Sequence, residues 1–132
     1  MTLQRVNPAS LAAPSGFSHA VAATGSRIVF LAGQTATDGD GGVVGSGVVE
    51  QFERALANLL AALAAAGGDP QHLAKLTVFV TDPADYREHA GELGEVWRRL
   101  VGRQYPAMAL IGIVRLWDPT ALVELEGIAV LP

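Results

Sequence analysis

Two acidic residues interrupt a stretch that is otherwise typical of a buried strand. In ALVELEGIAV, residues 121–130, Glu124 and Glu126 alternate with apolar residues. Because strand side chains alternate between the two faces of a sheet, both carboxylates must point to the same face. A carboxyl group in apolar surroundings can act as a general acid/base toward a bound water or nitrogen. The alternative is structural, with the acids at a rim or paired with Arg115 across a hairpin.

Two further segments contain residues suited to a binding site. Gly33 and Gln34 end the apolar run RIVFLAGQ. A glycine there allows close approach of a ligand or a neighbouring chain, and the Gln34 amide can both donate and accept hydrogen bonds. Phe17 and His19 lie in SGFSHAV, where an aromatic residue belongs to a core, an interface or a pocket. A packing glycine, a core phenylalanine and a hydrogen-bonded histidine remain the alternatives.

Composition excludes several kinds of chemistry. The 132 residues contain no cysteine, and the three histidines show no metal-ligand spacing, so we expect neither thiolate catalysis nor a metal. Phosphate-binding and dinucleotide-binding motifs are absent, and we expect no cofactor. Nine basic residues are spread along a chain of net charge −4, which argues against nucleic acid as a partner. Without a signal peptide or a membrane span, the protein is expected to be cytoplasmic.

The chain order of the elements predicts an α+β fold. Short apolar runs at 18–24 and 27–34 suit a hairpin through Gly25-Ser26, and a Gly-rich loop follows over 35–47. Apolar residues spaced by three and four then predict a helix that ends at Gly67-Gly68. This apolar stripe comprises Val49, Phe52, Leu56, Leu59, Leu60 and Leu63.

The second half of the chain predicts a strand, a helix and two further strands. Residues 73–81 are apolar on both faces, which is typical of a central strand. Asp82-Pro83 begins a second helix that ends at Gly102. Strands at 107–116 and 121–130 are expected to form a hairpin through Asp118-Pro119. The buried stripe of the second helix is predicted to comprise Tyr86, Ala90, Leu93, Trp97 and Leu100.

These elements predict one domain over residues 1–132, in the order β-β-α-β-α-β-β. Two helices most easily cover one face of a mixed sheet. The other face would then be apolar and uncovered, and a monomer rarely exposes such a face. We therefore expect the chain to assemble with copies of itself.

Six segments in order resemble the Rid/YjgF family of reactive intermediate deaminases. They are SGFSHAV, IVFLAGQ, LANLLAALAAAG, LAKLTVFVTDPADY, YPAMALIGIVRL and ALVELEGIAV. The resemblance covers about Pro14 to Val130 and implies a chorismate-mutase-like fold. It also implies a homotrimer whose sheets form an inner barrel, with a site in each cleft between neighbours. Family members hydrolyse enamines and imines such as 2-aminoacrylate without a cofactor.

The resemblance also assigns roles to individual residues. Phe17 corresponds to the family's site aromatic, and Gly33 to the glycine of its Ser-Gly-Gln motif. Glu124 corresponds to the glutamate that positions the attacking water. The implied place of Glu124 is therefore the cleft between subunits, and the resemblance leaves the roles of Glu126 and His19 open.

The sequence departs from the family pattern at the position that binds the substrate carboxylate. Met108 stands where deaminating members carry an arginine, Phe17 where tyrosine is common, and Ala90 where asparagine often occurs. A thioether cannot make the bidentate, charge-assisted bond of a guanidinium. We therefore expect an apolar pocket lined by Phe17 and Met108, with the backbone amides of Ala109 and Leu110 binding an oxygen or nitrogen.

The sequence thus predicts a divergent family member that processes a small imine or enamine, neutral or more hydrophobic than 2-aminoacrylate, with Glu124 as the acid/base. The alternative is a non-catalytic, ligand-binding or regulatory trimer on the same scaffold. In both cases the expected partners are further copies of the chain and a small metabolite, and no cofactor or metal is expected.

Overall fold

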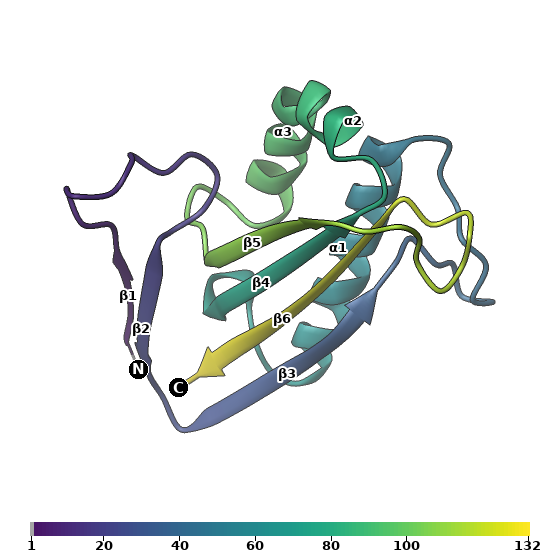
Figure 1. Ribbon diagram of the computed structural model, residues 1–132. Coiled ribbons are helices and arrows are strands. Elements are labelled where there is room, and N and C mark those ends of the chain that lie inside the picture. Colours follow the sequence, from purple (N-terminus) through teal and green to yellow (C-terminus); the bar gives the residue numbers. More distant parts are fainter. Residues whose placement is uncertain (1) are drawn as a thin grey trace.

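The computed structural model describes residues 2–132 and contains a four-stranded mixed sheet, helices on one face of it, and a separate two-stranded ribbon (Figure 1). The strands are β1 (Thr2–Val6), β2 (Ala20–Thr24), β3 (Arg27–Gln34), β4 (Leu73–Val80), β5 (Ala107–Gly112) and β6 (Val123–Leu131). The helices are α1 (Val48–Ala65), α2 (Pro83–Glu88) and α3 (Ala90–Leu100), with a 3-10 turn at Pro70–His72.

Helix α1 forms because its apolar residues recur at helical spacing and its remaining positions are rich in alanine. The helix packs that stripe against β3 and β6. Gly67, with φ of +92°, follows its end in the left-handed region that glycine adopts without strain. The predicted helix and its end are confirmed.

The sheet order is β3-β6-β4-β5, with β4 parallel to β5 and antiparallel to β6. The central position predicted for residues 73–81 is confirmed, since β4 has a partner on each side. The predicted hairpin between the last two strands is wrong, because β4 lies between β5 and β6. Instead of turning back on β5, β6 crosses to fill the gap between β3 and β4.

The predicted hairpin between the first two strands is also wrong. β2 pairs with β1, which the sequence did not reveal, whereas β3 pairs with β6 (Figure 1). Ser18 fixes the ribbon to the start of β5, since its hydroxyl donates to the Tyr105 carbonyl at 2.7 Å and its N–H to the Pro106 carbonyl at 2.9 Å. The ribbon thus brings the loop over residues 7–19 to the edge of the main sheet.

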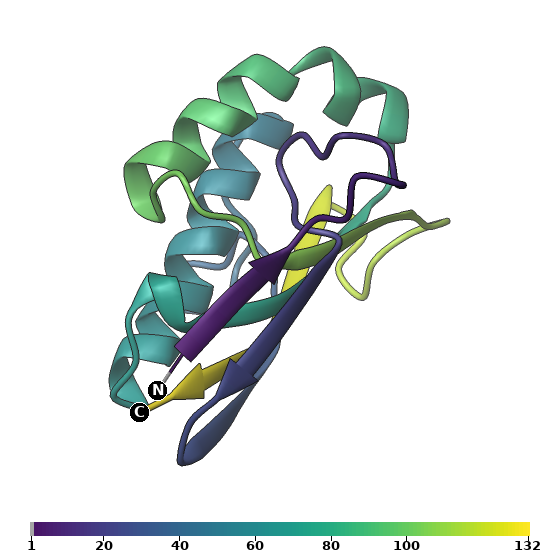
Figure 2. The same cartoon turned by 90° about the vertical axis from the view of Figure 1, so that its left-hand side faces the viewer.

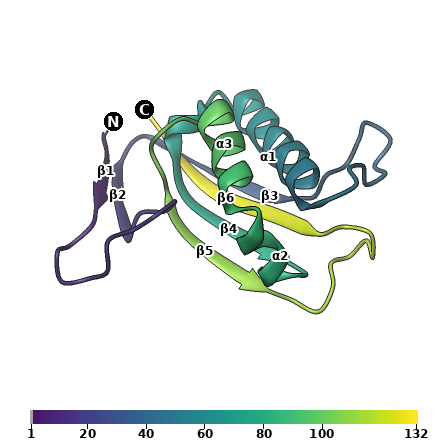
Figure 3. The same ribbon diagram turned by 90° about the horizontal axis from the view of Figure 1, so that it is seen from above.

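The second predicted helix is divided at His89 into α2 and α3. Asp82 caps α2 by accepting a hydrogen bond from the Asp85 N–H at 3.1 Å. All three helices lie on the same side of the sheet (Figure 2), and α1 and α3 lie side by side across it (Figure 3). Gly102, with φ of +117°, follows the end of α3 as predicted.

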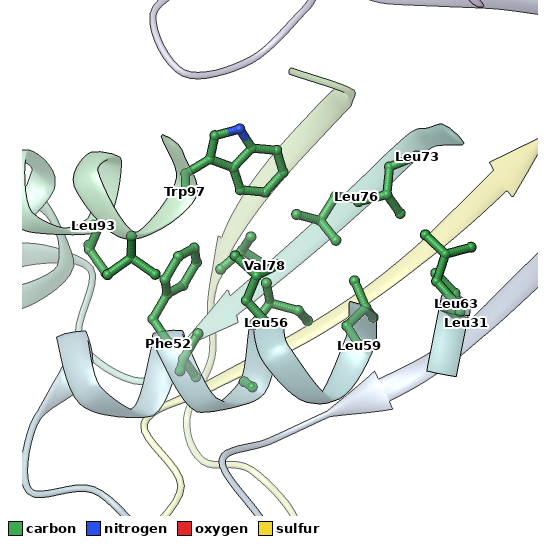
Figure 4. Close-up of a cluster of buried hydrophobic side chains, with 14 of the residues drawn as sticks. Leu31, Phe52, Leu56, Leu59, Leu63, Leu73, Leu76, Val78, Leu93 and Trp97 are labelled. Atoms are coloured by element: carbon green, nitrogen blue, oxygen red, sulfur yellow. The ribbon is translucent and has the colours of Figure 1, made fainter. Parts of the chain in front are cut away.

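The core lies between the helices and the sheet (Figure 4). Odd-numbered residues of β6 are buried against the helices, and Leu56, Leu59 and Leu63 of α1 cover them. The even-numbered residues of β6 face the open side of the sheet, which confirms that Glu124 and Glu126 share a face. On that side Ile28 is 62% and Phe30 76% exposed, which is the apolar, uncovered face expected from the sequence.

Candidate functional site

Glu124 lies on the open face of the sheet beside a glycine that leaves it room. The side chain is half-buried, and its neighbours across the ladder are Gly33 on β3 and Phe79 on β4. A Cβ atom on Gly33 would lie 2.9 Å from both Cδ and Oε1 of Glu124, so any side chain there would displace the carboxylate. Within residues 2–132 the Glu124 carboxylate makes no hydrogen bond or ion pair. Among these residues it is therefore an acid without a protein partner.

A local irregularity of β3 places Gly33 there. Leu31 pairs with Gly127 and Gln34 with Leu125, so three steps along β3 match two along β6. The extra residue is a β-bulge, a feature that redirects side chains at a strand end. The bulge and the glycine together bring the backbone of β3 against the Glu124 carboxylate.

The loop after this bulge is attached to α1. The Asn58 side-chain amide donates to the carbonyl oxygens of Thr35, at 3.2 Å, and of Thr37, at 2.9 Å. Arg54 donates from Nε to the Thr37 carbonyl at 3.0 Å. Because these donors come from a packed helix, the backbone that follows Gly33 is held in place relative to the core.

A second group of predicted residues gathers at the edge strand β5. Phe17, Met108, Ala109 and Leu110 all line one cavity of about 200 Å³. Met108 pairs with Leu76 in the parallel ladder and faces the helices, where it packs against the core. The remaining lining residues are Ser15, Gly16, Val78 and Tyr86.

Phe17 is held at this cavity by His19. The two rings meet edge to face, with centroids 5.0 Å apart and planes at 83°. The ring of His19 is fixed by a 2.7 Å contact between Nε2 and the Ala12 carbonyl, and its backbone N–H donates to Oδ1 of Asn7 at 2.8 Å. His19 therefore orders the loop that carries Phe17.

A larger cavity, of about 280 Å³, adjoins the first. The two share Ser15, Gly16, Tyr86 and Met108 as walls. Burial raises the pKa of Tyr86 to about 12, so its hydroxyl stays neutral through the physiological range. The other lining residues are Phe52, Ala90, Leu93, Gly94, Trp97, Arg98 and Tyr105.

The structure therefore brings the predicted residues into two groups rather than one. Gly33 and Glu124 are together on the open face. Met108 and Leu110 point to the helix side of β5, and β4 separates that strand from β6. The two cavities lined by Met108 include neither Gly33 nor Glu124.

The suggested ion pair between a β6 acid and Arg115 is absent from the described chain. The Arg115 guanidinium instead donates to the carbonyl oxygens of Leu116 and Trp117, at 3.3 and 3.4 Å. The reason is that β5 ends at Gly112, so Arg115 lies in the loop beyond it, and that β5 and β6 are not neighbours in the sheet. Glu126 is exposed and lines a shallow cavity with Lys75 and Phe30.

Sequence reasoning missed Arg98, Tyr86 and Trp97 as cavity residues. The expected pocket is an apolar one lined by Phe17 and Met108, whereas the Arg98 side chain lines the larger cavity, which Met108 also lines. The signal in the sequence is the spacing of Gly94 and Arg98, since residues four apart adjoin on a helix. Ala90, expected in the buried stripe, is exposed at the cavity, and Val96 is buried instead.

The fold and these residues define a small α+β protein with helices on one sheet face and an unpaired acid on the other. The family model described as Endoribonuclease L-PSP matches residues 7–131. The crystal structure of the Rid-family protein YyfB from Yersinia pestis superimposes with a TM-score of 0.88 and 30% identity, over 99% of this chain and 100% of that one. The chain belongs to the Rid/YjgF family.

Curated relatives give the same assignment. Protein DfrA of Myxococcus xanthus is 35% identical over 115 residues, which are 86% of this chain and 84% of that protein. The 2-iminobutanoate/2-iminopropanoate deaminase of Mus musculus is 34% identical over 105 residues, 79% of this chain and 74% of that protein. None of the helices in residues 2–132 has the length and apolar content needed to cross a membrane.

Proposed function

We propose that this protein hydrolyses a small imine or enamine in clefts between copies of the chain, with Glu124 as the general acid/base. The observation that carries the proposal is the Glu124 carboxylate, which lies over Gly33 and has no partner within residues 2–132. A carboxylate that is half-buried on an apolar face, and paired with nothing, is available to bind water and exchange its proton.

The reaction needs only water. An enamine first takes a proton on carbon and becomes the iminium ion, and an imine reaches the same ion by taking a proton from solvent on nitrogen. Glu124 accepts a proton from water as the oxygen attacks the C=N carbon, which gives a neutral carbinolamine. Glu124 then returns that proton to the nitrogen, the C–N bond breaks to release ammonia, and the hydroxyl group loses its proton to solvent as the carbonyl group forms. Neither a redox partner nor a cofactor is required.

The second copy of the chain completes the site in this proposal. Glu124 and the Phe17–Met108 cavity face different sides of the sheet in one chain, so a neighbour is needed to bring them together. The exposed apolar face at Ile28 and Phe30 favours such an association, because monomers rarely leave large apolar patches in water. A closed homotrimer, as inferred from the family resemblance, would cover all these faces equally.

The edge position of β5 supports the role proposed for its backbone. β5 pairs with β4 on one side, and on the other side only Ala107 has a bridge, to Ser18, within residues 2–132. The strand beyond Ala107 therefore has a free edge. Because the N–H groups of successive strand residues point to opposite edges, and the Ile113 N–H donates to the Val80 carbonyl of β4, the free amide of the Ala109–Leu110 pair is that of Leu110. Such a donor can stabilise negative charge on the substrate or the carbinolamine oxygen.

The names of the relatives favour this chemistry over RNA cleavage. The mouse relative is named as a deaminase of 2-iminobutanoate and 2-iminopropanoate. The family model carries an endoribonuclease description, but a chain with net charge −4 is poorly suited to bind a polyanion. We therefore propose the imine reaction and not RNA cleavage.

The test is ammonia release from imines generated in situ from alanine, leucine and a neutral amine. Glu124→Gln keeps the shape of the side chain and removes its basicity, and we expect ~100-fold or greater loss of kcat. Glu126→Gln, two residues along the same face, is the matched control and should retain activity. Release that is unchanged in Glu124→Gln would exclude the mechanism. Ligand binding without ammonia release in the unmodified protein would favour a binding or regulatory role.

A further inference from the structure

Arg98 places a guanidinium at the mouth of the larger cavity. It follows Gly94 by one helical turn on α3, and a Cβ atom on Gly94 would lie 3.2 Å from its Nη1. The side chain therefore folds back along the helix across the space that glycine leaves open. The result is a cation directed at the cavity that Tyr86, Trp97 and Met108 line.

This guanidinium has no partner within residues 2–132. Its neighbour Arg99 pairs with Glu53 of α1, so α3 carries one paired and one unpaired arginine side by side. A guanidinium offers five N–H donors in a planar fork that fits a carboxylate. Arg98 can therefore bind an anion without first breaking a contact.

The walls next to Arg98 are apolar and aromatic. Trp97 and Tyr105 stack with centroids 5.6 Å apart and planes at 15°, and the Phe52 and Tyr86 rings meet edge to face at 6.2 Å. Met108 adds a flexible thioether that adapts to ligand shape. These side chains would contact the hydrocarbon part of a ligand.

Tyr86 adds one neutral donor. Its hydroxyl has no hydrogen-bond partner within residues 2–132, and no buried polar side-chain atom there lacks a partner. The hydroxyl is therefore accessible to solvent at the cavity. Because burial raises the pKa of Tyr86 to about 12, the group stays protonated and can donate to an anionic oxygen.

We propose that the larger cavity binds a small carboxylic acid with an aromatic or branched apolar body. The carboxylate would bind Arg98, with the Tyr86 hydroxyl as a second donor, and the body would lie among the aromatic walls. One cation and one neutral donor fit a single negative charge better than a phosphate dianion. That this ligand represents the substrate class rests on the proposed function. Binding of the ligand itself can be measured without turnover.

The test uses phenylacetate and its neutral isostere phenylacetamide as probes of the full-length protein. Trp117 is 96% exposed, so Trp117→Phe leaves Trp97, in the cavity wall, as the single tryptophan, which is excited selectively over the two tyrosines. In this background we expect saturable quenching by phenylacetate. Arg98→Gln should weaken phenylacetate about five- to tenfold, a modest factor because the guanidinium is solvent-exposed, and should not change the affinity for phenylacetamide.

Two further variants sharpen this test. Arg103→Gln removes the same charge from an exposed arginine with no partner in residues 2–132, and should bind phenylacetate as the parent does. Gly94→Ala puts a methyl group 3.2 Å from Nη1 of Arg98, which displaces the guanidinium slightly, and should weaken phenylacetate by a smaller factor than Arg98→Gln while preserving α3. Equal binding by Arg98→Gln and the parent, equal weakening by Arg103→Gln, or no saturable quenching in the parent would overturn the inference.

Failure here is separable from failure of the proposed function. Glu124→Gln should abolish ammonia release and still bind phenylacetate, because Glu124 does not line this cavity. Arg98→Gln should raise KM for the imine of phenylalanine with little change in kcat. If Glu124→Gln retained full turnover, the proposed mechanism would fail, and the fluorescence titrations would still decide the binding site.

Discussion

The Glu124 carboxylate lies against Gly33 so closely that a methyl group on Gly33 would meet Cδ and Oε1 of the acid at 2.9 Å. The two residues come from neighbouring antiparallel strands, β3 and β6. The acid keeps its position only because the facing residue has no side chain. This relationship makes Gly33 a sensitive point for the proposed reaction, although it carries no functional group.

Gly33→Ala should reduce kcat/KM for imine hydrolysis by ~10- to 100-fold, because small displacements of a catalytic group have large effects on rate. The backbone of Gly33 is not in the left-handed region, so the free energy of unfolding should change by less than about 1 kcal/mol. Steady-state kinetics and urea unfolding measure the two effects. Gly39→Ala is the control, since a Cβ atom there meets nothing within 4 Å, and equal rates in both variants would contradict the prediction.

Met108→Arg should increase turnover of the imine of alanine by roughly tenfold, because a charge-assisted bond to a carboxylate contributes ~1.5–3 kcal/mol. Met108 lines both cavities, so the new cation would reach a ligand in either. Ammonia release from the alanine and neutral-amine imines distinguishes a charge effect from a general one. Met108→Leu, which keeps the apolar volume, should show no such gain, and an assembled Met108→Arg protein without a gain would contradict the prediction.

The stability of the protein should fall between pH 10 and 12. Burial raises the pKa of Tyr86 from 10.0 to about 12, so in this range the unfolded chain loses the proton that the folded chain keeps. The stabilisation is complete below pH 10 and disappears as the pH passes 12, a loss of about 2–3 kcal/mol. Urea unfolding at pH 9 and 11 should show about half of this loss, since pH 11 lies midway between the two pKa values. In Tyr86→Phe the slope should decrease by the contribution of this group, and an unchanged slope would contradict the assignment.

Gln51→Leu should lower the free energy of unfolding by about 2 kcal/mol or more. Gln51 is buried, with Nε2 donating to the Gly45 and Thr120 carbonyls and Oε1 accepting from the Leu122 N–H at 2.8 Å. Leucine leaves these backbone groups unpaired, at a cost of ~1–3 kcal/mol each. Urea unfolding at a fixed protein concentration measures the change. Gln71→Leu, at an exposed position, should stay within about 0.5 kcal/mol.

Local patterns in the sequence predict the elements that depend on local burial. The spacing of Phe52, Leu56 and Leu63 predicts α1, since each turn of the helix returns an apolar residue to the sheet. The alternation around Glu124 and Glu126 predicts their shared face, because the odd-numbered residues of β6 fill the core. In both cases the spacing of apolar residues along a single helix or strand is enough to predict which of its faces is buried.

Strand order depends on partners that are distant in the sequence. Asp118 forms a turn as predicted, with Oδ1 accepting from the N–H and hydroxyl of Thr120. That turn does not determine where β6 pairs. The space between β3 and β4 accepts a long apolar strand, and residues of β6 such as Val123 and Leu125 become fully buried there. Turn chemistry is local, whereas this gain in burial is a property of the whole sheet.

The candidate site also combines residues that local sequence predicts with residues that only the fold brings together. Glu124, Gly33 and Phe17 were identified from short motifs. Arg98 and Tyr86 were not, because they reach the cavity from α3 and α2, and only folding places them beside Met108. The sequence of β5 contains no pattern that predicts the Arg98 guanidinium of α3 beside Met108.

The bulge in β3 also decides which residue the acid meets. Were the ladder regular beyond Leu31, the alternation of sides would turn Gly33 inward opposite Leu125 and set the Gln34 amide opposite Glu124. Because of the one extra residue in β3, the Glu124 carboxylate lies beside Gly33, which has no side chain, and not beside the Gln34 amide. The freedom of this carboxylate thus originates in the length of the backbone between Leu31 and Gln34, and not in any group that could touch a substrate.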